Sequence, residues 1–239
     1  MMNRGSFVDG SHYFAQGIRL LGHPRLRLFI LIPLLLNIVV FVVLTAVLVQ
    51  QFSNMVAAMT DWLPDWLAFL AWILTLIAAL FTVLIYGYFF SLITNLIAAP
   101  FYGILAEKVE ALVTGRVVDG EPLWQLIPRT IFRELSKLWY FLWRSVIVLL
   151  LSFVPFVGQF IGFIWGAWSM SVQYTDYAAD NHQWPFSRCR RRLSGELWSS
   201  LGFGGLVMVM MMIPIVNIII PTASVIGGTL FWLDQKQEH

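Results

Sequence analysis

The sequence is poor in charged residues and contains one cysteine. Asp, Glu, Lys and Arg make up 12% of the 239 residues, whereas hydrophobic residues make up 59%. Soluble domains carry about 25% charged residues, so this composition excludes an ordinary soluble protein. The single cysteine, Cys189, excludes an intrachain disulfide. Its neighbours Arg188 and Arg190–Arg192 predict that it faces a reducing cytosol.

Motifs of several enzyme classes are also missing. The sequence has no phosphate-binding loop, no Gly-x-Ser-x-Gly, no Cys pair and no His pair at metal-ligand spacing. We therefore expect no enzyme activity, no cofactor, no metal site and no transport driven by ATP on this chain. The net charge of +2 is small, and we expect no nucleic-acid partner.

One cluster imitates a metal or acid–base site. Asp176, Asp180 and His182 lie close together in the sequence, and the two aspartates share a helix face. A helix cap or an ion pair with the cluster Arg188–Arg192 is the preferred interpretation. A membrane-embedded hydrolase using Asp180 and His182 is the least favoured alternative.

What the sequence has instead is long uncharged runs. Four tracts contain no Asp, Glu, Lys or Arg: Leu28–Thr60, Trp66–Ala106, Ser145–Thr175 and Leu197–Leu233. A hydrocarbon core about 30 Å thick needs roughly 20 apolar residues in a helix, so these tracts predict an integral membrane protein. The first tract begins too late and is too long for the hydrophobic region of a signal peptide, so no cleavable signal is expected.

The basic residues of the polar gaps predict the orientation. Residues 3–27 hold four arginines and one acid, and residues 61–65 hold two acids and no base; the two later gaps hold six and four basic residues. Because cytoplasmic loops are enriched in Lys and Arg, both termini are expected in the cytoplasm and residues 61–65 outside. The first two tracts then give transmembrane helices at 25–60 and 65–99, the second ending near Pro100.

The last two tracts begin and end next to cytoplasmic charges, so each must enter the membrane and return. Each carries turn residues near its middle, Pro155–Gln159 in the first and Pro214–Asn217 in the second. Arms of about 9 to 16 residues span roughly 14 to 24 Å, less than the hydrocarbon core. We predict two re-entrant, partly penetrating helical hairpins. Two tilted hairpins that cross fully are the alternative.

Two further stretches are amphipathic. Residues 8–21 carry apolar side chains at helical spacing and predict an interfacial helix. Pro128–Arg144 predicts a second amphipathic helix, with a basic and an apolar face, within a cytoplasmic amphipathic region 107–144. The chain is thus predicted to be an all-α integral membrane protein with one domain, 1–239. Its predicted order is amphipathic helix 8–21, transmembrane helices 25–60 and 65–99, amphipathic region 107–144, hairpin 145–175, basic loop 176–196 and hairpin 197–233.

Two basic features could meet an anion. At the start of the first crossing, Pro24 suits a first helical turn, and the amides of Arg25, Leu26 and Arg27 would be free at the positive end of the helix dipole. The alternative is that the two arginines set the topology and bind only lipid head groups.

The second basic feature is a stripe. Arg129, Arg133 and Lys137 recur every four residues on one helix face. They would either contact anionic lipid or line an aqueous anion path opposite Glu107 or Glu110.

Glycines predict close helix packing. Gly158, Gly162 and Gly166 recur every four residues, which is the spacing that lets helices approach one another. This face is expected to contact either another subunit of a homo-oligomer or the rest of the same chain.

The order of several short segments resembles the CysZ sulfate transporter family of bacterial inner membranes, over nearly the whole chain. The matching pieces are Tyr13–Gly17, Ile32–Asn37, Pro64–Trp66, Gly87–Ser91, Asn95–Glu107, Pro155–Gln159, Gln173–Tyr174, Asp176–Tyr177, Asp180–His182, Pro185–Phe186 and Ile213–Asn217. The resemblance implies an all-helical, oligomeric protein that moves sulfate, and similar oxyanions such as sulfite, into the cytoplasm for cysteine synthesis. The alternative function is a membrane adaptor or regulatory subunit that transports nothing itself.

The resemblance also implies site residues. The family's Gly-Leu-Arg-like sulfate-binding turn maps onto Arg25, Leu26 and Arg27, of which Arg27 keeps the arginine of the motif. Position 25 has arginine where glycine is usual, and Leu28 stands where a second basic residue is common.

With this resemblance, Glu107, Arg129 and Arg133 become the candidates for a charged path. Sulfate and membrane lipid are the expected partners.

Overall fold

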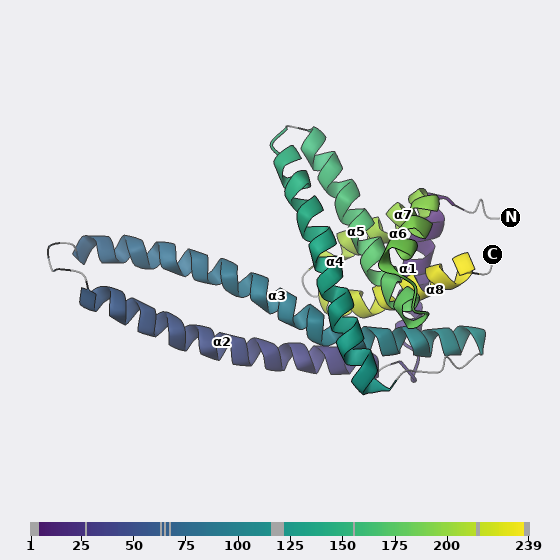
Figure 1. The fold of residues 1–239 in the computed structure, drawn as a ribbon, viewed down its shortest axis with the longest axis horizontal. Coiled ribbons are helices and arrows are strands. Elements are labelled where there is room, and N and C mark those ends of the chain that lie inside the picture. The colour runs from purple at the N-terminus through teal and green to yellow at the C-terminus, as the bar shows by residue number, and fades with distance from the viewer. Residues whose placement is uncertain are drawn as a thin grey trace. The chain divides into compact units, whose positions relative to one another are not determined.

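The computed structural model describes residues 5–26, 28–62, 64, 66, 68–115, 122–154, 156–213 and 216–236. Every regular element within these residues is a helix, so the predicted all-α fold is confirmed (Figure 1). The helices are α1 (Phe7–Leu21), α2 (Leu28–Trp62), α3 (Ala68–Thr114), α4 (Leu123–Leu151), α5 (Val157–Asn181), α6 (Phe186–Gly195), α7 (Leu197–Met211), the short 3₁₀ helix η2 (Val216–Ile218) and α8 (Ile220–Lys236).

The chain folds as two compact units. The first comprises Met1–Ile32 and Ala99–His239, and the second comprises Pro33–Ala98. The division falls within α2 and α3, so each of these two helices contributes to both units.

The second unit consists of most of α2 and the first part of α3, which lie side by side in Figure 1. Leu31–Asp61 and Leu70–Thr114 are both long and apolar enough to cross a membrane, as predicted for the first two tracts. The hydroxyl groups of Thr45 and Tyr86 lie 2.7 Å apart and join the two helices. Most of the remaining side chains in this pair are apolar, and few of the described ones are buried, as a surface facing lipid requires.

The limits of these two helices differ from the predicted ones. α2 begins at Leu28 rather than at residue 25, because the preceding residues form a turn in which the Leu26 amide donates to the His23 carbonyl at 2.9 Å. α3 continues to Thr114, whereas Pro100 was expected to end it. An interior proline removes one helical hydrogen bond and its ring crowds the carbonyl of residue i−4, but packing at the buried side chain of Leu105 supports the helix beyond it.

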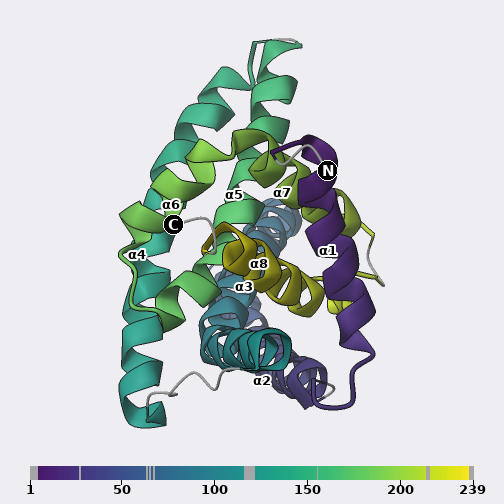
Figure 2. The ribbon, with the colours of Figure 1, turned by 90° about the vertical axis from the view of Figure 1, so that its right-hand side faces the viewer.

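The first unit is built around α8 (Figure 2). This helix packs against α1 and α5, and α7 packs against the same two helices. Nearly every side chain from Ile220 to Leu233 is buried. A helix that is apolar on all sides is stable when other helices surround it. Burial inside the protein therefore explains the apolar sequence of α8, which the sequence pattern alone assigns to an arm of a hairpin inside the membrane.

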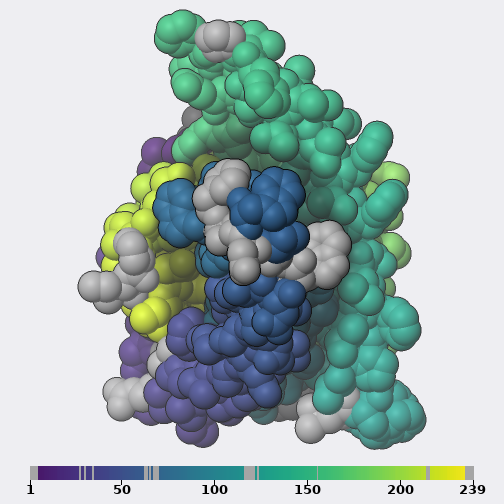
Figure 3. Space-filling view, turned by 90° about the vertical axis from the view of Figure 1, so that its left-hand side faces the viewer, coloured from purple at the N-terminus to yellow at the C-terminus, as the bar shows by residue number. Residues whose placement is uncertain are grey.

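α4 and α5 form the first predicted hairpin, and residues 152–154 and 156 lie between the two helices. α4 is a single helix of 29 residues, so the amphipathic region and the first apolar arm, predicted as separate pieces, are continuous. The tip projects beyond the other helices of the first unit (Figure 3). Phe153 is 80% exposed and Phe156 is 78% exposed. An exposed aromatic tip agrees with insertion into a membrane, and how deeply it inserts stays a prediction.

Close helix contacts occur at glycines, but not at all of the predicted ones. A Cβ atom on Gly204 of α7 would overlap the carbonyl oxygen of Ala167 in α5. Of the predicted glycine face, Gly158 and Gly166 have neighbours within the chain, whereas Gly162 faces open space. Packing of Gly162 against the described part of its own chain is therefore excluded, and its contact with another subunit stays a prediction.

Candidate functional site

Six charged side chains of α4 and α5 form an ion-pair cluster in the first unit: Arg129, Arg133, Glu134, Lys137, Asp176 and Asp180. Arg133 lies at its centre. Its Nε and Nη2 donate to the two carboxylate oxygens of Asp176 at 2.8 and 2.6 Å, and its Nη1 lies 2.9 Å from the carboxylate of Asp180. Such a bidentate pair fixes both the distance and the relative orientation of the two helices.

Lys137 is the most deeply buried cation of the cluster. Its side chain is 1% exposed, and its ammonium group contacts Glu134 and lies 3.3 Å from Asp176. The ammonium also lies 4.5 Å from the ring centroid of Tyr177. Gln173 donates to Glu134 at 3.2 Å, so the carboxylate that pairs with Lys137 is itself held in place.

The arginines also bind the backbone where α5 ends. Arg129 donates from Nη1 to the carboxylate of Asp180 at 2.9 Å and to its carbonyl oxygen at 2.7 Å. Arg133 donates to the carbonyl of Trp184 at 2.7 Å. Carbonyl groups at the end of a helix have no partner within the helix and carry its negative dipole end, so guanidinium groups stabilise them.

Burial and pairing act in opposite directions on these groups. Burial favours a lower pKa for Lys137, but the carboxylates of Glu134 and Asp176 raise that pKa above its ordinary value. Burial favours a higher pKa for Asp176, but Lys137 and Arg133 bring it below the usual range. For Asp180 burial prevails over its two arginines, and its pKa is raised. Three cations thus face three acids, and the positive charge of the α4 stripe is already matched.

The predicted partner of the two aspartates is wrong. Asp176 and Asp180 were expected to cap a helix or to pair with Arg188–Arg192, whereas they pair with the stripe on α4. The signal was present in the sequence, because the four-residue spacing of the two aspartates matches that of Arg129 and Arg133. Two helices side by side can align both spacings.

Asp180 and His182 do not form an acid–base pair. The Nε2 atom of His182 lies 2.8 Å from the carboxylate of Glu110 in α3, and its ring stacks on Trp232 with centroids 4.4 Å apart. Asp180 contacts the arginines instead. Within the described part of the chain, no group of three His, Cys, Asp or Glu residues could hold a metal ion.

The residues predicted for a charged path lie on α3 and α4. Arg129 and Arg133 both contact Asp180 and therefore lie side by side. Glu107 is partly buried on α3, three residues before Glu110, the residue that joins α3 to His182. The structure thus connects α3 to the residue that follows α5, close in sequence to the arginine-bound Asp180.

The predicted anion-binding turn differs from expectation at its amides. The Arg25 amide donates to Nδ1 of His23 at 3.3 Å, and the Leu26 amide donates to the His23 carbonyl at 2.9 Å. The expectation that both amides are free is therefore wrong, because His23 supplies acceptors from its ring and its backbone. The side chain of Leu26 is buried, that of Arg25 is exposed, and Arg27 lies outside the described residues.

Comparison with known proteins identifies the family. The model of the family described as sulfate transporter CysZ/etoposide-induced protein 2.4 matches residues 13–221. A sulfate transporter CysZ of Pseudomonas aeruginosa is 42% identical over 241 residues, which cover 97% of each chain. Proteins of the same name from Pseudomonas fluorescens and Pectobacterium atrosepticum are 40% and 36% identical, over 96% and 95% of this chain and 94% and 85% of theirs. The chain belongs to the sulfate transporter CysZ/etoposide-induced protein 2.4 family.

Proposed function

We propose that this membrane protein transports sulfate, and related oxyanions such as sulfite, across the bacterial inner membrane into the cytoplasm for cysteine synthesis. The observation that carries the proposal is the similarity to a sulfate transporter over 97% of both chains. Two helices long and apolar enough to cross a membrane agree with it. The protein acts as a transporter rather than an enzyme, and it works as a homo-oligomer.

Sulfate first binds at Arg25, Leu26 and Arg27. A doubly charged anion leaves water only where fixed donors replace its hydration. Because the amides of Arg25 and Leu26 already have acceptors, the donors come from the guanidinium groups and the positive end of the α2 dipole. The exposed side chain of Arg25 supports this assignment.

Beyond this turn, Glu107, Arg129 and Arg133 contribute a charged path. Both arginines are paired with carboxylates, so an anion that reaches them must share their donors with Asp176 and Asp180. Sharing weakens binding along the path. Weak binding at successive sites is what permits an ion to leave as well as to enter.

Uptake into sealed vesicles tests the transport proposal. Vesicles containing the purified protein are expected to accumulate radiolabelled sulfate faster than vesicles without protein. Monodisperse, correctly inserted protein that gives no uptake would favour the alternative, an adaptor or regulatory subunit of another transporter. Chloride in place of sulfate is the control for an unselective leak.

Substitution of Arg27 tests the binding turn. Charge-assisted hydrogen bonds contribute on the order of 1.5–3 kcal/mol each, so Arg27→Ala is expected to weaken sulfate binding by about one to two powers of ten. Arg27→Lys should recover part of the loss, because an ammonium lacks the planar fork of a guanidinium. Arg25→Ala should cost less. Calorimetry measures the affinities, and unchanged binding by a well-folded Arg27→Ala protein would assign these arginines to lipid head groups.

We further propose that both termini lie in the cytoplasm and that the hairpins re-enter without crossing. Gln159 and Asn217, near the two turns, are exposed on the protein, so the described part of the chain itself does not shield them. Cysteines placed there are expected to resist an impermeant thiol reagent added from the periplasmic side. A cysteine at Asp61, also exposed and predicted to lie outside, is the positive control. Labelling of Gln159 or Asn217 at the rate of the control would indicate full crossings.

A further inference from the structure

A second cationic site lies where α4 meets α6, and nothing in the proposed transport mechanism uses it. Its centre is the ring of Tyr140. The guanidinium carbon of Arg144 lies 4.0 Å from the centroid of this ring, and that of Arg190 lies 4.1 Å from it. Both guanidinium groups therefore pack on the same ring. Phe186 adds a second ring contact to Arg190 at 4.8 Å.

Stacking on a ring does not use the hydrogen-bond donors of an arginine. A guanidinium stacks through its flat face, whereas its N–H groups point outward in its plane. Among the described residues, no carboxylate lies within ion-pair distance of Arg144 or Arg190, in contrast to Arg129 and Arg133. The Nε atom of Arg190 is shielded from solvent and has no acceptor among those residues. The ring therefore holds two cations in place, and their N–H groups are available to bind an anion.

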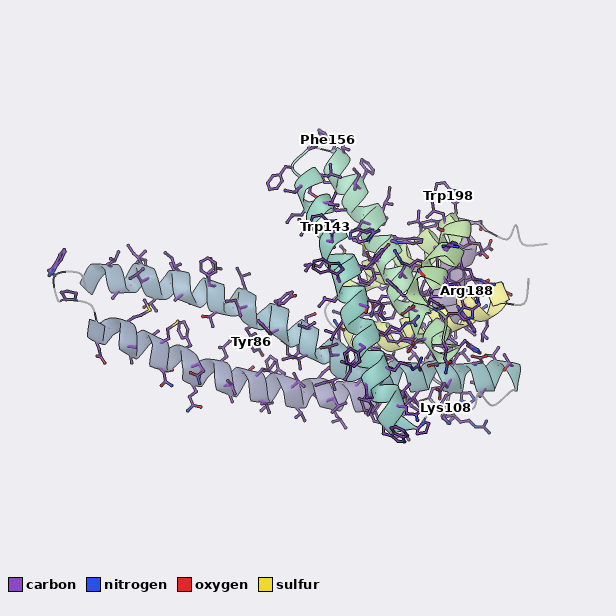
Figure 4. All side chains as sticks on the ribbon, viewed as in Figure 1. Tyr86, Lys108, Trp143, Phe156, Arg188 and Trp198 are labelled. Carbon is purple, nitrogen blue, oxygen red and sulfur yellow. The ribbon has the colours of Figure 1, made fainter. Side chains whose placement is uncertain are left out.

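The surroundings of Arg144 place this site at the surface of the membrane. Arg144 is the last charged residue before the uncharged tract Ser145–Thr175. From Arg144 to the tip at Phe156 the hairpin exposes apolar side chains. Trp143 lies on the same hairpin, away from the tip (Figure 4). Trp139 and Trp143 are both exposed on α4. Exposed tryptophans gather at the level of the lipid head groups, so Arg144 lies at the depth of the lipid phosphates.

We propose that Arg144 and Arg190, held on the ring of Tyr140, bind the phosphate of an anionic phospholipid. Two cations without a carboxylate partner favour a head group with net negative charge over a zwitterionic one, which brings its own cation. Arg188, 4.1 Å from the ring centroid of Trp184, adds to the positive field. The bound lipid joins α4 to α6 and fixes the hairpin at the membrane surface.

Lipid titration of the purified full-length protein tests this site. In native mass spectrometry from neutral detergent, phosphatidylglycerol is expected to bind more tightly than phosphatidylcholine. A basic residue near an anionic surface contributes about 1 kcal/mol, so Arg144→Gln and Arg190→Gln should each weaken phosphatidylglycerol binding by about fivefold. Phosphatidylcholine binding should not change. Glycerol phosphate, which has the phosphate without the acyl chains, should bind far more weakly than the lipid.

Two controls make the test specific. Arg191→Gln removes the same charge from an exposed position on α6 that is not stacked on Tyr140, and it should have little effect. Arg144→Lys and Arg190→Lys keep the charge and should retain most of the binding even where the fold is sensitive to substitution. The proposal is overturned if phosphatidylglycerol and phosphatidylcholine bind equally, if Arg191→Gln weakens binding as much as the other two glutamine variants, or if glycerol phosphate binds as tightly as the lipid.

Discussion

Replacing Asp176 by asparagine is expected to lower the stability of the protein by about 3–5 kcal/mol, the usual cost of leaving a buried charge without its partner. Asp176 and Lys137 are each 1% exposed, and Arg133 uses Asp176 for a bidentate pair. An asparagine keeps the shape but removes the negative charge that compensates both cations. For a chain of this size the melting temperature should fall by roughly 6 to 20 °C, measured by size exclusion after heating in detergent.

Two companion variants test whether the unbalanced charge causes the loss of stability. Asp180→Asn should cost less, because Asp180 is less buried and its raised pKa brings it closer to the neutral form that asparagine imitates. Adding Arg133→Met to Asp176→Asn removes the cation that has lost its bidentate partner and leaves Lys137 with Glu134, so part of the stability should return. A single Asp176→Asn variant that melts with the wild type would mean that water, rather than Asp176, compensates these cations.

The sequence predicts the membrane class and the two long helices well, because the length of an uncharged run can be compared directly with the thickness of a bilayer. It predicts helix limits poorly. Pro100 was expected to end α3, but the helix continues where Leu105 packs in the first unit. The apolar sequence of α8 has the composition of a lipid-facing segment, although the protein itself surrounds it. Composition cannot distinguish these two surroundings, since both exclude water.

For the candidate site, too, the sequence predicts some features and misses others. The basic stripe on α4 follows from helical periodicity, which needs only one element. Its partners Asp176 and Asp180 lie on another helix, and Arg188–Arg192 offered cations closer in the sequence. At the anion-binding turn, His23 accepts hydrogen bonds from the amides of Arg25 and Leu26. These bonds depend on the backbone path of the turn. Pairings between elements therefore required the fold, whereas patterns within one element did not.

Replacing Gly204 by alanine is expected to disrupt the first unit strongly, although it adds only one methyl group. The new Cβ atom would overlap the carbonyl oxygen of Ala167 and lie 2.7 Å from the backbone nitrogen of Ser171. Both obstacles are backbone atoms, so no side-chain rotation relieves them and α5 and α7 must move apart. Overpacking costs about 1–3 kcal/mol, and backbone contacts place this variant at or above the upper end. The melting temperature in detergent measures the loss.

Gly162 supplies the matched control, because it lies on α5 in the face predicted from the sequence and yet has nothing within 4 Å of its added Cβ. Gly162→Ala should melt no lower than the wild type, since alanine also has the higher helix propensity. Gly162→Leu then distinguishes the two partners that the glycine pattern allowed. If this face contacts another subunit, the bulky side chain should reduce the assembled mass, measured by light scattering, while the monomer stays folded. Equal destabilisation by Gly204→Ala and Gly162→Ala would contradict the packing of α5 against α7, because only Gly204 lies at that crossing.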